Sequence, residues 1–188
     1  DSRIKKIGGR KLLGSAFTVK TRSGDNLMLH KALQMAEPGD VIVVDAGGEL
    51  KQAITGEIMM ATAAQKGIAG VIIDGAVRDV EALQQMEMPI YAAGVTPAGP
   101  HKEGPGEINV PVRVGGVVIR PGDILVGDGD GVVVIRPEDV GDLIEKAHEK
   151  HKGERDIMKI IREGKRDYSW IDKELIAKKC EILDEVSK

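Results

Sequence analysis

Short runs of consecutive apolar residues mark the first half of the chain. Residues 41–44 (VIVV) and 71–73 (VII) contain no polar side chain, and turns follow them at 45–48 (DAGG) and 74–75 (DG). Short uninterrupted apolar runs are typical of strands that are buried on both faces. The pattern therefore predicts two strands in the interior of a covered sheet.

Segments with helical periodicity lie between these runs. In residues 26–36 the apolar positions fall on one face, and Pro38 follows shortly after the pattern ends. Residues 56–66 and 80–86 predict two further helices, and residues 14–21 predict a strand. This alternation of strand and helix predicts parallel βαβ units with right-handed crossovers.

The pattern changes after Pro89. A long loop rich in glycine and proline comes first, then short β runs joined by glycine-rich turns, and finally two charged helices. The loop is predicted at 94–107, the strands at 109–114, 116–119, 124–126 and 132–135, and the helices at 137–163 and 172–186. The short runs predict antiparallel pairing.

Together these elements predict an α/β fold, a mixed-sheet sandwich with one domain over residues 1–140 and a helical extension over 141–188. A chain of 188 residues is long enough for such a core, and 41% hydrophobic with 30% charged residues is a globular composition. The net charge of −3 argues against nucleic acid as a partner. No apolar run reaches the length of a membrane helix, and a single cysteine fits a reducing cytoplasm.

The first candidate site feature is Glu57, which follows Gly56 at a predicted helix start. A helix N-terminus exposes unpaired N–H groups and carries partial positive charge, so it can seat a carboxylate. Here the N–H groups of Ile58 and Met59 are predicted to face a ligand. The alternative is that Glu57 simply stabilises the first helical turn.

The second feature is the pair Arg78-Asp79, 21 residues after Glu57 and just beyond a predicted buried strand. Ligands of open α/β sheets bind at the carboxyl ends of strands. Arg78 offers a planar fork for a carboxylate, and Asp79 is a hard oxygen ligand suited to Mg²⁺ or Mn²⁺. The alternative is a salt bridge in which Asp79 is the N-cap of the following helix.

At this point the chain resembles a known family. The segments 56–62 (GEIMMAT) and 70–79 (GVIIDGAVRD) are similar to those of the divalent-metal pyruvate aldolases acting on 4-hydroxy-4-methyl-2-oxoglutarate, whose family includes the regulator of ribonuclease activity A. The resemblance covers residues 8–140 and includes GDN at 24–26, DAGG at 45–48 and DGDGVV at 128–133. It implies a swivelling β/β/α fold.

The resemblance also implies roles for the matching residues. Asp79 would bind the metal, Mg²⁺ or Mn²⁺, and Arg78 would bind the substrate and stabilise the enolate oxygen of pyruvate. Glu57 would hold a metal-bound water. The substrate-binding positions would be Gly56 and the N–H groups of Ile58 and Met59, with Gly47 and Gly48 allowing close approach of the backbone.

Family members form trimers or hexamers, in which an acid from a neighbour's C-terminal helix lies near the metal. Glu154 matches that acid. The implied activity is cleavage of a 4-hydroxy-2-oxo acid to pyruvate, with oxaloacetate decarboxylation as a second activity. The alternative is a non-catalytic regulator that binds an RNA-processing enzyme.

Two departures from the family pattern are visible. The aldolases usually have Asp where this chain has Glu57, and the usual N-terminal helical segment is expected to be absent or shortened. The regulators commonly lack the acid at the position of Asp79. Its presence here favours a catalyst.

Overall fold

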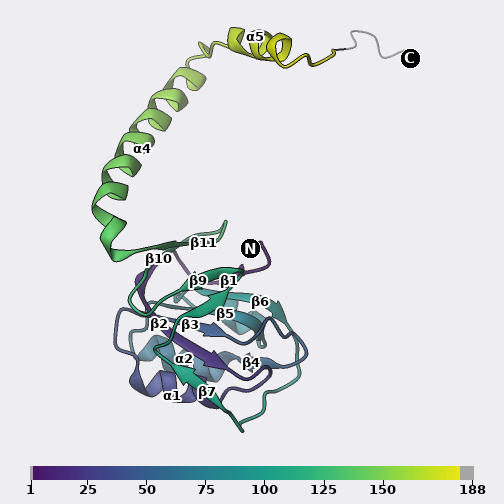
Figure 1. Ribbon diagram of the computed structural model, residues 1–188, viewed down its shortest axis with the longest axis vertical. Helices are drawn as coiled ribbons and strands as arrows, with labels where there is room; N and C mark the ends of the chain where they lie inside the picture. Colours follow the sequence, from purple (N-terminus) through teal and green to yellow (C-terminus); the bar gives the residue numbers. More distant parts are fainter. Residues whose placement is uncertain (1, 183–188) are drawn as a thin grey trace. The chain divides into compact units, whose positions relative to one another are not determined.

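The computed structural model (Figure 1) describes residues 2–182, which divide after Asp139 into two compact units. The first unit begins with β1 (Lys5–Gly8), β2 (Leu12–Thr21), α1 (Leu27–Met35), β3 (Asp40–Asp45) and β4 (Ala53–Thr55). It continues with α2 (Glu57–Gln65), β5 (Gly70–Val77), α3 (Val80–Gln84), β6 (Ile90–Val95) and β7 (Gly106–Ile108). It ends with β8 (Val112–Val114), β9 (Val117–Ile119), β10 (Ile124–Gly127), β11 (Val132–Ile135) and the short 3₁₀ helix η1 (Pro137–Asp139).

The main sheet is mixed, which confirms the predicted α/β class. Its strand order is β1-β6-β5-β3-β2-β10-β11, with β4 beside β5 and β7 beside β2. The pairs β2–β3, β3–β5 and β5–β6 are parallel, whereas β10 is antiparallel to both of its neighbours. These parallel strands form the βαβ units that the apolar runs in the first half of the sequence predict.

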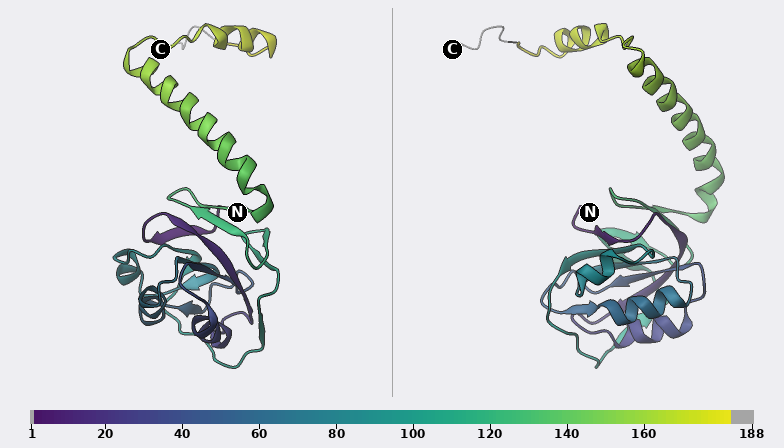
Figure 2. Two further views of the ribbon diagram at one scale, coloured as in Figure 1. Left: turned by 90° about the vertical axis from the view of Figure 1, so that its left-hand side faces the viewer. Right: turned by 180° about the vertical axis from the view of Figure 1, so that it is seen from behind.

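The central strands are buried on both faces, and their successive side chains alternate between two cores. On β3, Ile42 and Val44 join the core beneath α1, α2 and α3, while Val41 and Val43 join the opposite core. Both faces are covered, which explains the uninterrupted apolar run. Figure 2 shows the helices gathered on one face of the sheet.

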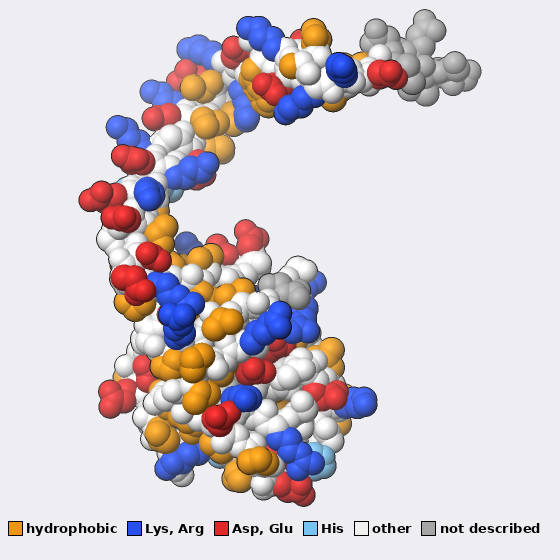
Figure 3. All heavy atoms as spheres, in the orientation of Figure 1, with side chains coloured by type: hydrophobic (Ala, Val, Ile, Leu, Met, Phe, Trp, Pro, Cys, Tyr) orange, Lys and Arg blue, Asp and Glu red, His pale blue; other side chains and the backbone are white. Residues whose placement is uncertain are grey.

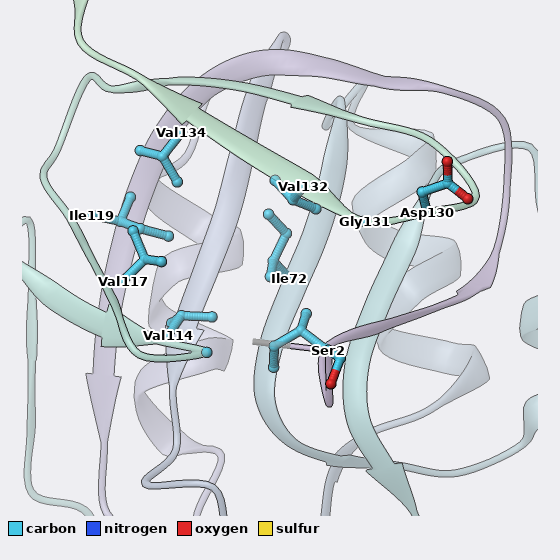
Figure 4. Close-up of a pocket in the computed structure, with 11 residues that line it drawn as sticks. Ser2, Ile72, Val114, Val117, Ile119, Asp130, Gly131, Val132 and Val134 are labelled. Atoms are coloured by element: carbon cyan, nitrogen blue, oxygen red, sulfur yellow. The ribbon is translucent and has the colours of Figure 1, made fainter. Parts of the chain in front are cut away.

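The β8–β9 pair supplies the second layer. Two strand carboxylates anchor it: Asp45 Oδ2 accepts from the N–H of Arg113 at 3.2 Å, and Asp74 Oδ2 accepts from that of Gly115 at 2.8 Å. An apolar cavity of about 240 Å³ lies between this pair, β5 and β11, with Ile72, Val114 and Val134 in its walls (Figure 4). Among residues 2–182, Asp130 is the only charged residue in its wall.

The structure differs from the sequence-based elements at several points. Residues 74–75 are predicted as a turn, yet β5 runs through them to Val77. The strands β1, β4, β6 and β7 are absent from the predictions, and β7 begins inside the predicted loop and ends one residue after it. The predicted last helix at 172–186 is wrong in its bounds: α5 ends at Ala177, and residues 183–186 lie outside the described part.

The second unit contains α4 (Val140–Arg162) and α5 (Ser169–Ala177). Neither helix contains a buried residue, and apolar side chains such as Ile144, Met158 and Trp170 remain about half exposed along them (Figure 3). Among residues 2–182, no helix combines the length and the apolar character needed to cross a membrane.

Candidate functional site

The start of α2 and the end of β5 lie side by side because β4 pairs with β5. In this parallel pair Ala53 stands opposite Ala76 and Thr55 opposite Val77, and the N–H of Arg78 donates to the Thr55 carbonyl at 3.0 Å. Chain continuity then puts Gly56 and the first turn of α2 beside Arg78 and Asp79. A short strand that the sequence does not reveal is therefore what unites the two halves of the predicted site.

A hydrogen bond joins the two halves directly. Asp79 Oδ2 accepts from the backbone N–H of Glu57 at 3.0 Å, and Arg78 Nε lies 3.6 Å from the same oxygen. Asp79 precedes α3 at the N-cap position, but its side chain makes no capping bond to that helix. The alternative therefore holds in part: Asp79 pairs with Arg78 and stands at the N-cap position of α3, but its carboxylate stabilises the start of α2 and not that of α3.

The backbone of Asp79 is strained. Its φ of 58° lies in the left-handed region, which L-residues adopt infrequently outside Asn, Asp and Gly. Such conformations are concentrated at functional sites, where the surrounding structure holds them. Here β5 and the hydrogen bond to Glu57 hold it.

Gly56 makes the close approach possible. A Cβ atom built on Gly56 would collide with Asp79 Oδ2 and would lie 2.9 Å from Arg78 Cγ. The φ of Gly56 is −160°, an extended conformation open to any residue, so space is the constraint at this position. A glycine here lets a carboxylate and a guanidinium reach a helix start.

A small cavity of about 50 Å³ lies at this junction. Five residues singled out from the sequence line it: Gly56, Ile58, Met59, Arg78 and Asp79. Asp79 already accepts from the Glu57 N–H, whereas the first-turn N–H groups of Ile58 and Met59 have no partner within the helix and are available to an anion. Arg78 and Asp79 also border a second cavity of about 530 Å³, whose walls include Val80, Val95 and Pro97.

Three other predicted residues lie elsewhere. Gly47 lines a separate cavity of about 400 Å³ with Asp45, Asp74 and Arg113, and a Cβ on Gly48 would approach the Arg3 guanidinium. Glu154 belongs to α4 in the second unit, where Lys150 Nζ is 3.9 Å from its carboxylate. The first unit therefore assembles the Gly56–Asp79 cluster without these three residues.

The donor set fits a hard, water-rich divalent cation. Among residues 2–182, no group of three His, Cys, Asp or Glu side chains could enclose a metal. In the same part of the chain, Asp79 Oδ1 has no hydrogen bond or ion pair, and the side chain is 42% exposed. Mg²⁺ and Mn²⁺ typically take one or two carboxylates and complete their shell with water and substrate oxygens.

Sequence reasoning missed three residues of the small cavity: Asn26, Thr55 and Pro100. Asn26 and Thr55 are both 3% exposed. One signal in the sequence could have pointed to Asn26. It stands next to Asp25 at the start of α1, and both residue types cap helices, so one of the two is free for another role. Nothing in the sequence places Pro100 at this cavity. It belongs to the loop that follows β6, and only the folding of that loop brings it to the cavity.

Asp25 holds that loop. Its Oδ1 accepts from the N–H of Leu27, while Oδ2 accepts from the N–H groups of Glu103 at 2.6 Å and Gly104 at 3.0 Å. Burial alone would raise the pKa of Asp25, but these three hydrogen bonds outweigh it and lower the pKa below the usual 3.8. A charged, buried carboxylate thus ties the loop carrying Pro100 to the start of α1.

Known proteins resemble this chain in sequence and in fold. A family model described as RraA-like, Aldolase/RraA, matches residues 1–134. A protein of Halalkalibacterium halodurans, provisionally named 4-hydroxy-4-methyl-2-oxoglutarate aldolase, is 48% identical over 139 residues, which are 74% of this chain and 66% of that protein, just under two thirds of its length. A Thermus thermophilus protein named 4-hydroxy-4-methyl-2-oxoglutarate aldolase is 39% identical over 133 residues, covering 70% of this chain and 80% of that protein.

Among solved structures, the RNA-processing inhibitor RraA from Thermus thermophilus matches with a TM-score of 0.67 and 38% identity, over 71% of this chain and 82% of that chain. Residues 1–134, which the family model matches, contain the junction of β4, α2 and β5. The family model alone covers well over half of the sequence. The chain therefore belongs to the RraA-like, Aldolase/RraA family.

Proposed function

We propose that this protein is a divalent-metal-dependent lyase that cleaves a 4-hydroxy-2-oxo acid, such as 4-hydroxy-4-methyl-2-oxoglutarate, to release pyruvate. Oxaloacetate decarboxylation is the expected second activity, because both reactions leave the same negative charge beside a keto group. The observation that carries the proposal is the convergence of Arg78, Asp79 and the first turn of α2 on one cavity.

Asp79 would hold the metal, which polarises the keto oxygen of the substrate when it is bound. The carboxylate of the 2-oxo acid would accept from the first-turn N–H groups of Ile58 and Met59. The Arg78 guanidinium would stabilise the charge that develops on the keto oxygen; losing one such donor lowers rates by about 10²–10³. Glu57, exposed beside Asp79, would position the water that exchanges protons.

Assembly belongs to the same proposal. In a homotrimer or homohexamer, Glu154 of a neighbouring copy would complete the site. Apolar side chains of α4 are exposed, which supports the proposal that the second unit packs against a neighbouring copy.

The test measures pyruvate release from 4-hydroxy-4-methyl-2-oxoglutarate and from oxaloacetate, with Mg²⁺, with Mn²⁺ and with a chelator. We expect metal-dependent release that Arg78→Ala lowers by about 10²–10³. Arg136→Ala, which removes an arginine that follows β11 and pairs with Asp123 just before β10, is the arginine control. Absence of turnover of both substrates with either metal would contradict the proposal.

A second candidate function is a non-catalytic regulator of an RNA-processing enzyme. The similarity to the Thermus thermophilus protein described as an RNA-processing inhibitor favours it. In that case the protein would inhibit a ribonuclease in vitro, and neither the chelator nor Asp79→Asn would change the inhibition.

A further inference from the structure

The cavity beside Arg78 and Asp79 contains two buried polar atoms without partners. Within residues 2–182, neither Asn26 Oδ1 nor Thr55 Oγ1 makes a hydrogen bond, although both residues are 3% exposed and line the cavity. Buried polar groups in folded proteins are almost always hydrogen-bonded, so each exception requires an explanation.

The position of Asn26 suggests that its side chain caps α1, but it does not. It occupies the N-cap of α1 but forms no side-chain cap there, while Oδ1 of the adjacent Asp25 accepts from the N–H of Leu27 at 2.9 Å. The Asn26 amide instead donates from Nδ2 to Met59 Sδ at 3.4 Å. That contact connects the starts of α1 and α2, and it leaves Oδ1, which can only accept, without a donor.

Thr55 differs from a comparable buried threonine of the same sheet. Thr18 on β2 is fully buried and donates to the Val110 carbonyl at 2.6 Å. Thr55 ends β4, and its backbone carbonyl accepts from Arg78, but its hydroxyl has no partner. The fold satisfies a buried threonine hydroxyl away from the cavity and leaves one unsatisfied beside it.

We infer that Asn26 and Thr55 bind the hydroxyl group of a hydroxylated 2-oxo acid and select such acids over unhydroxylated ones. The inference rests on the proposed function. The carboxylate and keto oxygens of the substrate can only accept, so they cannot satisfy Asn26 Oδ1. A hydroxyl can donate to Asn26 Oδ1 and accept from Thr55 Oγ1 at the same time, which satisfies both atoms. Oxaloacetate in its keto form offers no such group.

The first arm of the test is stability without ligand. Replacing an unpaired buried hydroxyl by a methyl group of the same shape removes an unsatisfied group, so Thr55→Val should leave Tm unchanged or raise it. Thr18→Val, the matched control, deletes a hydroxyl that has a partner and should lower Tm by several degrees. A fall in Tm for Thr55→Val equal to that for Thr18→Val would overturn the inference.

The second arm is specificity. Asn26→Leu and Thr55→Val should each lower kcat/KM for 4-hydroxy-4-methyl-2-oxoglutarate at least about tenfold more than kcat/KM for oxaloacetate, because only the first substrate loses a hydrogen bond. Thr55→Ser keeps the hydroxyl and should keep the wild-type ratio. Equal losses for both substrates would overturn the inference.

The two levels of failure can be told apart. If the wild-type protein releases no pyruvate from either substrate, the proposed function fails. If the wild-type protein is active and both variants keep its substrate ratio, the proposed function stands and the inference about Asn26 and Thr55 fails.

Discussion

The carboxylate of Asp79 accepts a hydrogen bond from the backbone N–H of Glu57, 22 positions earlier in the chain, at 3.0 Å. One oxygen of Asp79 therefore serves the fold, because it satisfies a first-turn N–H group of α2. The other oxygen has no partner within residues 2–182. This division of labour allows the structural role of Asp79 to be separated from its chemical role.

The substitution Asp79→Asn separates them. The amide oxygen of Asn can still accept from Glu57, so Tm should change by no more than a few degrees. Loss of the negative charge should weaken metal binding and lower metal-dependent turnover by at least about 10². Calorimetry with Mn²⁺ and thermal unfolding measure the two effects. Asp40→Asn is the control, since Asp40 also accepts from a backbone N–H, that of Glu37, away from the site.

The substitution Gly56→Ala should act only through steric collision. The added methyl group collides with the Asp79 carboxylate, so either the start of α2 or the end of β5 must move. We expect a loss of about 1–3 kcal/mol in the free energy of unfolding and a loss of turnover. Gly129→Ala, where nothing lies within 4 Å of the added atom, should change neither quantity. Wild-type turnover in Gly56→Ala would show that the close approach is dispensable.

Asp25 should make stability depend on pH in the acid range. Its pKa in the folded state lies below 3.8, so its stabilising effect is fully present above pH 3.8 and is lost as pH falls through the folded-state pKa. At pH 7, Asp25→Asn should lower the free energy of unfolding by about 2 kcal/mol. The difference from wild type should shrink as the pH is lowered below 3.8. A difference that does not change with pH would show that the charge of Asp25 contributes nothing.

If Glu154 acts across a subunit interface, two inactive variants should complement each other. Glu154→Gln should lower turnover by about 10² or more, and Arg78→Ala should also be nearly inactive. Mixing the two under conditions of subunit exchange creates sites with both groups intact, so activity should reappear. Glu149→Gln, another exposed acid on α4, should keep full activity. Mixtures that stay inactive after verified exchange would place Glu154 outside the site.

The sequence predicts the parallel half of the sheet well because apolar runs and helical periodicity are local signals. It fails at residues 74–75, where an Asp-Gly pair is typical of a turn. Asp74 instead lies buried within β5, because the Gly115 N–H and the Arg3 guanidinium both donate to its carboxylate. Those partners are 41 and 71 positions away, so no local pattern reports them.

The residues of the candidate site also fall into those that the sequence predicts and those that it does not. The charged residues at a helix start and a strand end follow from motif and position, and the structure brings them together. Asn26 and Thr55 escape notice because their importance depends on which hydrogen bonds are missing in the folded chain. The pairing of β4 with β5, which aligns Thr55 with Val77, is also a long-range contact between short segments.

The left-handed backbone of Asp79 has a consequence for selection. Asparagine also tolerates that conformation, and its amide oxygen can still accept from the Glu57 N–H, so a library of variants selected only for heat resistance should admit asparagine at position 79 as readily as aspartate. A library selected for growth that depends on the proposed reaction should retain aspartate. The amino acid at this one position would therefore reveal which pressure a given population had experienced.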